Sequence, residues 1–129
     1  MTIRIDLGSP VPVYRQVADA IRVRLVEGSL APGEQLPPVR QLALDLGVHF
    51  NTVAEAYRTL SGEGWLDLKR RRGAVVLKRA KPKTAESGTE QAFQGRLREL
   101  AARAQADGIR PGRLAQALRA LAGELEEGR

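Results

Sequence analysis

The sequence predicts a mainly helical protein that has one small β-hairpin and a separate pair of helices near its carboxyl end. Three observations lead to this fold class. Apolar residues recur at spacings of three and four through several segments, which is the period of a helix that buries one face. After residue 64, a basic turn separates two short apolar runs, a pattern typical of a hairpin. A stretch poor in apolar residues, residues 80–88, then precedes the last two helical segments.

The first helix is predicted between Val13 and Gly28. Its apolar side chains advance by three and four residues, and they are Tyr14, Val17, Ala18, Ile21 and Leu25. Gly28 is expected to end the helix because glycine readily adopts the left-handed conformation found at helix C-termini. Before this helix, Ile3 and Ile5 alternate with polar residues, which predicts a short strand.

Two further helices are predicted close together. Pro38 suits a first helical position, where no amide partner is needed, so a helix is predicted over about residues 38–46. Gly47 ends this helix, Val48 enters the core, and the next helix begins near Asn51. Two short helices that share a core across a tight turn predict a helix-turn-helix.

A hairpin is predicted after Gly62 and Gly64, which end that helix. The apolar residues of its two strands are Trp65, Leu66 and Leu68 in the first, and Val75, Val76 and Leu77 in the second. The turn between them, residues 69–73, is strongly basic. A charged hairpin beside a helix-turn-helix predicts a winged helix-turn-helix fold.

The segment after residue 88 predicts two helices that each carry an apolar seam. The seam residues are Phe93, Leu97, Leu100, Leu114, Leu118, Leu121 and Leu125. Two short helices cannot bury these faces alone, so a partner surface is required, and a second copy of the chain is the simplest one. We therefore expect a winged helix-turn-helix domain at residues 1–79, a linker at residues 80–88 and a two-helix dimerisation tail at residues 89–129.

The charge of the chain lies in its first part. The formal net charge is +6 over 129 residues. Residues 1–83 hold 14 basic and 8 acidic side chains, whereas residues 84–129 hold 7 of each. Residues 69–83 alone hold eight basic and no acidic ones. This division predicts that the first part meets a polyanion and the tail meets protein, the alternative being a basic surface that only aids solubility.

The remaining composition narrows the class of protein. The chain has no cysteine, and its single histidine, His49, has no partner ligand, so we expect no disulfide, metal or cofactor. No apolar stretch approaches the roughly 18 residues of a membrane span. Residues 1–6 lack the apolar core of a signal peptide. These features predict a cytoplasmic protein that does not contact a membrane.

The amino-terminal turn of the helix after Gly47 carries residues that suit a DNA groove, namely His49, Phe50, Asn51 and Thr52. An asparagine can donate and accept toward adenine, and a threonine can bind a phosphate or contact a thymine methyl. The competing interpretation is that His49 or Asn51 only caps the helix. For Phe50, two positions are open: under the hairpin, or against a thymine methyl.

Basic residues outside that turn complete the predicted site. Arg40 lies on the first turn of the preceding helix, where it can reach a phosphate or a guanine edge, the alternative being an ordinary exposed arginine. The hairpin residues predicted to lie along DNA are Lys69, Arg70, Arg71, Arg72 and Gly73. Their cations would neutralise phosphates or enter the minor groove, with low sequence specificity.

At these residues the sequence resembles the winged helix-turn-helix domain of GntR-type bacterial transcription regulators. The resemblance covers residues 12–77, and its motifs are Gly33-Glu34-Gln35-Leu36-Pro37-Pro38-Val39-Arg40-Gln41-Leu42-Ala43, Leu46-Gly47-Val48, Asn51-Thr52-Val53 and Ala56-Tyr57. The short tail is similar to that of the YtrA-like group, in which a two-helix appendage is implied to mediate dimerisation. The resemblance implies DNA contacts by Arg40, by residues 49–52 and by the hairpin up to Gly73.

The chain also departs from the pattern of that family. Phe50 and Ala54 stand where the family often has arginine, and Arg71 stands where it often has glycine. These departures imply a different operator and a larger contribution of the hairpin to affinity. The short segment after Lys83 leaves no room for the ligand-binding or aminotransferase-like domains of other branches, so no pyridoxal cofactor is expected.

The leading hypothesis is a homodimeric, sequence-specific transcription regulator that acts as a repressor at a palindromic operator. Whether a small-molecule effector acts through the tail is left open. The second hypothesis is an RNA-binding or ribosome-associated protein, although five aromatic residues offer few stacking platforms for single strands. A protein-interaction module leaves the basic segment unexplained. An enzyme is not expected, because the sequence shows no nucleophile with a base, metal cluster or phosphate-cradling loop.

Overall fold

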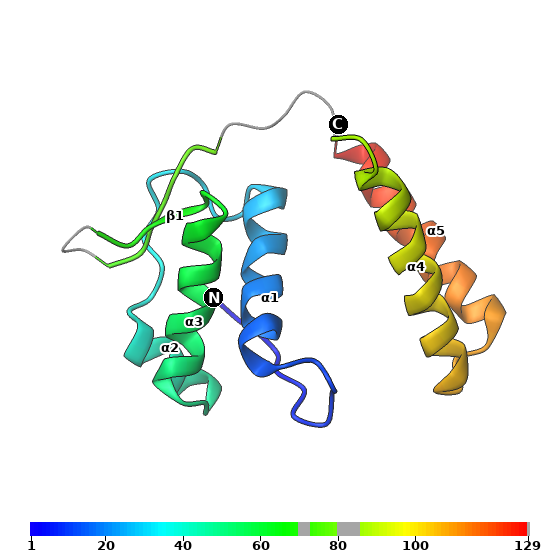
Figure 1. Cartoon of the computed structure of the whole chain (residues 1–129), viewed down its shortest axis with the longest axis horizontal. Coiled ribbons are helices and arrows are strands. Elements are labelled where there is room, and N and C mark those ends of the chain that lie inside the picture. The colour runs from blue at the N-terminus through cyan, green and yellow to red at the C-terminus, as the bar shows by residue number, and fades with distance from the viewer. Residues whose placement is uncertain (70–72, 80–85, 129) are drawn as a thin grey trace. The chain divides into compact units, whose positions relative to one another are not determined.

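A computed structural model describes residues 1–69, 73–79 and 86–128 of the chain (Figure 1). Contacts between residues divide the chain into two compact units, Met1–Ala80 and Lys81–Arg129. We call them the winged unit and the tail unit. The winged unit contains the helices α1, α2 and α3 and the strands β1 and β2, and the tail unit contains α4 and α5. The predicted fold class, mainly helical with a small hairpin, is confirmed.

The three helices of the winged unit are α1 (Val13–Glu27), α2 (Val39–Leu46) and α3 (Phe50–Gly62). Glycines end the first two helices as predicted, because Gly28 and Gly47 have φ angles of 86° and 69°. α3 packs against both α1 and α2. The short turn between α2 and α3 therefore forms the predicted helix-turn-helix, with boundaries within a residue or so of the expected ones.

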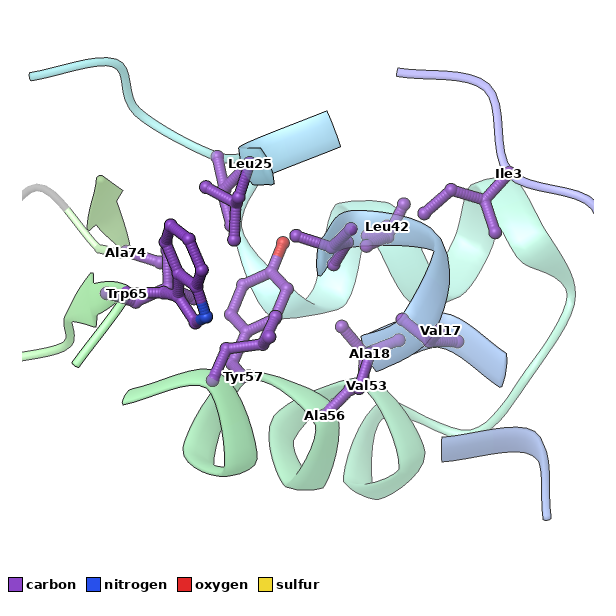
Figure 2. Close-up of a cluster of buried hydrophobic side chains, with 14 of the residues drawn as sticks. Ile3, Val17, Ala18, Leu25, Leu42, Val53, Ala56, Tyr57, Trp65 and Ala74 are labelled. Atoms are coloured by element: carbon purple, nitrogen blue, oxygen red, sulfur yellow. The ribbon is translucent and has the colours of Figure 1, made fainter. Parts of the chain in front are cut away.

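The core of the winged unit lies where α1, α2, α3 and the hairpin meet (Figure 2). Its buried hydrophobic residues are Ile3, Val17, Ala18, Ile21, Leu25, Leu36, Leu42, Ala43, Val53, Ala56, Tyr57, Leu60, Trp65, Leu66, Ala74 and Val76. Each large apolar side chain buried in this way contributes roughly 1.5–3 kcal/mol to folding. Because α3 contributes one apolar face to this core, its other face is left outward.

The hairpin consists of β1 (Leu66–Asp67) and β2 (Val75–Val76), paired antiparallel with Leu66 opposite Val76. A third segment, which the sequence pattern does not reveal, joins this sheet before α2. Gln35 forms an antiparallel bridge with Val75, and the Val76 amide donates to the Glu34 carbonyl at 2.8 Å. The hairpin is thereby fixed to the segment that leads directly into α2.

The predicted strand at Ile3 and Ile5 is wrong. Ile3 is buried, but the segment pairs with side chains of α1 instead of with another strand. Gln16 accepts a hydrogen bond from the Asp6 amide at 2.8 Å and donates one to the Asp6 carbonyl at 2.9 Å. Arg24 donates to the Thr2 carbonyl. Since these backbone groups are already satisfied, the segment can bury Ile3 without belonging to the sheet.

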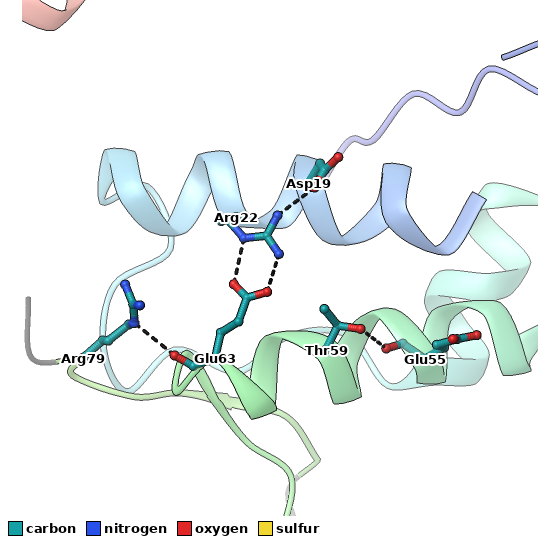
Figure 3. A network of polar contacts seen from close by, with 6 residues as sticks. All are labelled: Asp19, Arg22, Glu55, Thr59, Glu63 and Arg79. Carbon is teal, nitrogen blue, oxygen red and sulfur yellow. Dashed lines mark hydrogen bonds and ion pairs between the residues drawn. The ribbon is translucent and has the colours of Figure 1, made fainter. Parts of the chain in front are cut away.

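A polar network joins α1 to the end of α3 (Figure 3). Arg22 forms a two-pronged ion pair with Glu63, in which its Nε donates to Glu63 Oε1 at 2.8 Å, and it also pairs with Asp19. The hydrogen bond from Arg22 lowers the pKa of the Glu63 carboxyl below its usual range. Arg79 donates to the Glu63 carbonyl at 3.0 Å and lies over the Trp65 ring. The network thus ties the chain after β2 to the end of α3.

The tail unit consists of two helices, α4 (Thr89–Ala106) and α5 (Pro111–Glu127), which pack against each other. No residue of either helix is buried. The large hydrophobic side chains of the unit that stay exposed are Phe93, Leu100, Ile109, Leu118, Leu121 and Leu125. Leu97 and Leu114 are partly buried. The two predicted helices are present, but a single copy leaves most of their apolar surface in water.

Candidate nucleic-acid interface

The outward face of α3 is the feature around which the candidate site is built. Val53, Ala56, Tyr57 and Leu60 turn one side of the helix into the core. The helical period then places Asn51, Glu55 and Arg58 on the solvent side, where all three are exposed. The amino-terminal turn of α3 is therefore exposed, and it is the part of the helix that could enter a nucleic-acid groove.

Tyr57 links α3 to the segment before α2. Its hydroxyl donates to the Pro37 carbonyl at 2.6 Å, just before α2. Burial raises the pKa of the Tyr57 phenol well above its ordinary value, because the charged form loses hydration. The neutral hydroxyl therefore links α3 to the start of α2 across the physiological pH range.

His49 caps the helix that it precedes. Its Nδ1 accepts a hydrogen bond from the Asn51 amide at 3.0 Å. His49 therefore caps α3, while the Asn51 side chain has no hydrogen-bond partner in the part of the chain that the structure describes. The side-chain carboxamide of Asn51 is therefore available to a base edge. Thr52 beside it is half-buried.

Phe50 lies against its neighbours on both helices of the helix-turn-helix. Its ring stacks on the His49 ring with a centroid separation of 4.6 Å and an interplanar angle of 27°. Arg40 Cζ lies 5.3 Å from the centroid of the same ring. The side chain nevertheless remains 43% exposed. Together with Leu44 these residues border a shallow hollow between α2 and α3.

Arg40 occupies the first turn of α2, as expected, and is exposed. Among the residues that the structure describes, it has no carboxylate or hydrogen-bonding partner, and its contact is with the Phe50 ring. Its guanidinium is therefore available to an anion or to a base.

The structure describes only part of the predicted hairpin site. Lys69 is exposed, and its backbone amide donates to Asp67 Oδ1 at 3.0 Å. Gly73 has a φ angle of 85°, which strongly favours glycine. Arg70, Arg71 and Arg72 lie outside the described residues, so their contribution to a basic surface stays a prediction from the sequence.

Arg58 is a candidate that the sequence reasoning missed. It is exposed on α3, and it borders a hollow between α3, the start of α2 and the hairpin. Ala54, Leu68 and Gly73 border the same hollow. Arg58 lies seven residues after Asn51, and a helix brings residues at that spacing to one face. That period is the signal by which the sequence could have revealed it.

Over residues 1–69, 73–79 and 86–128, no group of three or more histidine, cysteine or acidic side chains is arranged to hold a metal ion. None of the helices in that same portion has the length and apolar character needed to cross a membrane.

Comparison with known proteins gives consistent matches. The family described as "Bacterial regulatory proteins, gntR family" matches residues 13–76. The HTH-type transcriptional repressor YtrA of Bacillus subtilis is 29% identical over 127 residues, which cover 98% of this chain and 97% of the relative. The structure of YtrA from Sulfolobus acidocaldarius, a GntR-family transcription factor, is 31% identical with a TM-score of 0.57, and the match covers 96% of this chain and 99% of that one.

A third match includes DNA. The DNA-binding domain of AraR, solved in complex with operator ORE1, is 28% identical with a TM-score of 0.50. The match covers 57% of this chain and 93% of that domain. The two YtrA proteins match almost the whole chain, whereas AraR matches a share close to the size of the winged unit.

Proposed function

Because this chain belongs to the GntR family of bacterial regulatory proteins, we propose that it is a transcription regulator that binds duplex DNA through α3 and represses from a palindromic operator as a homodimer. The observation that carries the proposal is the open first turn of α3. Its inner face is buried, while the Asn51 side chain points to solvent without a partner in the described part of the chain. A helix presented in this way suits the major groove.

Each candidate residue has a role that follows from its chemistry. Asn51 reads adenine, because its amide can donate and accept at the same base edge. Arg40 reads a guanine edge or binds a phosphate through its planar donors. Thr52 binds a phosphate through its hydroxyl. Arg58 and Lys69 contribute cations that neutralise the backbone without reading sequence.

The hairpin is the second contact in this proposal. The tip residues Arg70, Arg71 and Arg72 add positive charge to a segment, residues 69–83, that has no acidic residue. Contacts of this type raise affinity for every duplex and weaken as salt is added. Duplex DNA is favoured over RNA as the target because the similar domain of AraR was solved on an operator.

The tail unit is proposed to join two copies of the chain. Its helices bury no residue, yet they expose Phe93, Leu100, Leu118, Leu121 and Leu125. Exposed leucines at helical spacing are expected to pack against a second apolar surface. A second tail supplies such a surface with matching chemistry, and a two-fold pair of tails would place two α3 helices on two half-sites. The match to YtrA from Sulfolobus acidocaldarius covers the tail as well as the winged unit, so the tail is part of what the two proteins share.

The proposal is tested by binding titrations on a duplex enriched from a random pool. Affinity for this duplex and for a scrambled duplex is measured at several salt concentrations, with the matching RNA duplex as a further control. Arg40→Ala and Asn51→Ala should each reduce discrimination by about 1–3 kcal/mol. Arg58→Ala should weaken both duplexes alike and reduce the salt slope by about one. Equal effects of all three substitutions on both duplexes would exclude base reading by α3.

A further inference from the structure

Phe50 is not explained by DNA binding alone. It is a large apolar ring, 43% exposed, at the start of the helix proposed to enter the groove. It nevertheless touches two polar side chains, because its ring stacks on His49 and lies beneath the guanidinium of Arg40. Arg40 comes from α2 and Phe50 from α3, so this contact joins the two helices of the helix-turn-helix.

The ring is held from the α3 side. His49 Nδ1 accepts from the Asn51 amide at 3.0 Å, which fixes the imidazole to the first turn of the helix. The Phe50 ring then stacks on this imidazole at 4.6 Å. The backbone of α3 therefore positions His49, and Phe50 is positioned by its stacking on His49.

Arg40 is held differently. Within the described residues it has neither an ion pair nor a hydrogen bond, and its guanidinium lies over the Phe50 ring. A cation is attracted to the face of an aromatic ring, and a guanidinium in that position still has its N–H donors free at its edges. Holding a long side chain before binding reduces the entropy that is lost when it contacts a base.

We propose that Phe50 is a positioning residue for Arg40: its ring is a shelf that holds the guanidinium in place and sharpens the preference of the chain for the base pair that Arg40 contacts. This inference rests on the proposed function. It assigns Phe50 a role through Arg40 and not through its own contact with DNA. The two roles differ in where a substitution acts along the operator.

The first test compares base preference in full-length variants. Affinities are measured for the enriched duplex and for its single base-pair variants, with Phe50→Leu, Arg40→Ala and the double variant. Phe50→Leu should reduce discrimination about three-fold, the size of an exposed cation–π contact, at the same base pair that Arg40→Ala affects. It should change nothing further when Arg40 is already alanine.

Two variants control this test. Phe50→Trp keeps an aromatic face and should restore the preference that Phe50→Leu loses. Leu44→Ala alters a 77% exposed residue that borders the same hollow without a ring contact to Arg40, and it should behave as the wild type. If Phe50→Leu instead affects a different base pair, additively with Arg40→Ala, then Phe50 contacts DNA itself and its positioning role for Arg40 is overturned.

The second test needs no DNA. In the free protein, the ring should shift the Arg40 Nε–H resonance and restrict its fast motion. Both effects should disappear in Phe50→Leu and persist in Phe50→Trp. An Arg40 resonance that does not respond to Phe50→Leu would overturn the positioning role of Phe50 and leave the proposed function untouched. A wild-type chain that keeps the shifted resonance but selects no duplex would overturn the proposed function, and with it the role in base reading.

Discussion

The winged unit and the tail unit are both built from helices with periodic apolar residues, but only one of them has an interior. The winged unit buries apolar side chains from all three helices and from the hairpin, including Val17, Ile21 and Leu60, each with no exposed surface. The tail unit buries none along α4 or α5, and Leu125 is 68% exposed. Periodicity alone therefore does not show whether a helix is stable within its own chain.

The difference lies in how many surfaces each helix meets. α3 is covered by α1, by α2 and by β1, so its apolar stripe is enclosed. Within the described part of the tail unit, α4 meets only α5, and two helices alone leave the outer part of each apolar stripe in water. We infer that the winged unit folds on its own, whereas the tail unit gains its stability by pairing with a second tail.

The largest effect is expected in the core of the winged unit. Leu60→Ala should lower its free energy of unfolding by about 2–5 kcal/mol, because a large buried side chain is replaced by a cavity. Urea unfolding followed by the fluorescence of Trp65, the single tryptophan, reports on this unit. Leu100→Ala, at a 67% exposed position of α4, should leave that midpoint in place. A midpoint that depends on protein concentration would contradict independent folding of the winged unit.

The next effect is expected in association. Leu118→Asp should weaken the pairing of tails by about 1.5–3 kcal/mol for each copy, because an apolar contact is replaced by a carboxylate. Sedimentation should show monomers at concentrations where the wild type is a dimer, while the Trp65 unfolding transition stays unchanged. An unchanged dimer would place the interface elsewhere.

A smaller effect is expected at the link between α3 and the segment before α2. Tyr57→Phe removes the hydrogen bond to the Pro37 carbonyl and should lower the free energy of unfolding by about 1 kcal/mol. Tyr14→Phe is the matched control, because Tyr14 is half-buried and has no hydrogen bond from its hydroxyl in the described part of the chain. Equal stability of the two variants would show that the Tyr57 hydroxyl adds nothing.

The smallest effect is expected at the ion pair between α1 and α3. Glu63→Gln should lower the free energy of unfolding by less than about 1 kcal/mol at neutral pH, since solvent screens this partly exposed pair. The pKa of Glu63 is lowered in the folded state, so its contribution is present above the usual value of 4.5 and is lost as the pH falls through the folded-state pKa.

The wild type and Glu63→Gln should therefore converge in acid. Thermal unfolding measured from pH 7 down to pH 3 tests this. Glu55→Gln, at an exposed position of the same helix without an ion pair in the described part of the chain, should show no such convergence. A constant difference between wild type and Glu63→Gln at every pH would show that the carboxylate charge is not the cause.

The sequence was sufficient where structure depends on local chemistry. Gly28 and Gly47 marked the ends of α1 and α2 because a helix C-terminus needs a left-handed residue. The period of the apolar residues predicted which face of α3 is buried. It was not sufficient for backbone pairing over a distance. No sequence period indicates the bridge between Gln35 and Val75. The alternation around the buried Ile3 predicted a strand, although backbone groups of this segment bond instead to the side chains of Gln16 and Arg24.

The candidate site divides in the same way. Residues 49–52 could be predicted, because the turn before a helix and its first residues are evident from the glycine and the apolar period. The contact of Phe50 with Arg40 could not, because it depends on how two helices meet and not on either helix alone. The missed Arg58 lies between these cases, since its face follows from the period but its place beside the hairpin does not.

We propose that two winged units, joined by their tails, read two symmetric half-sites of an operator. The most direct measurement is the sequence of duplexes selected from a random pool by the wild-type chain and, in parallel, by Leu118→Asp. The wild type should select an inverted repeat, with half-sites separated by about one helical turn of DNA or a multiple of it, and the variant should select single half-sites. Single, unrepeated sites selected by the wild type would contradict this proposal.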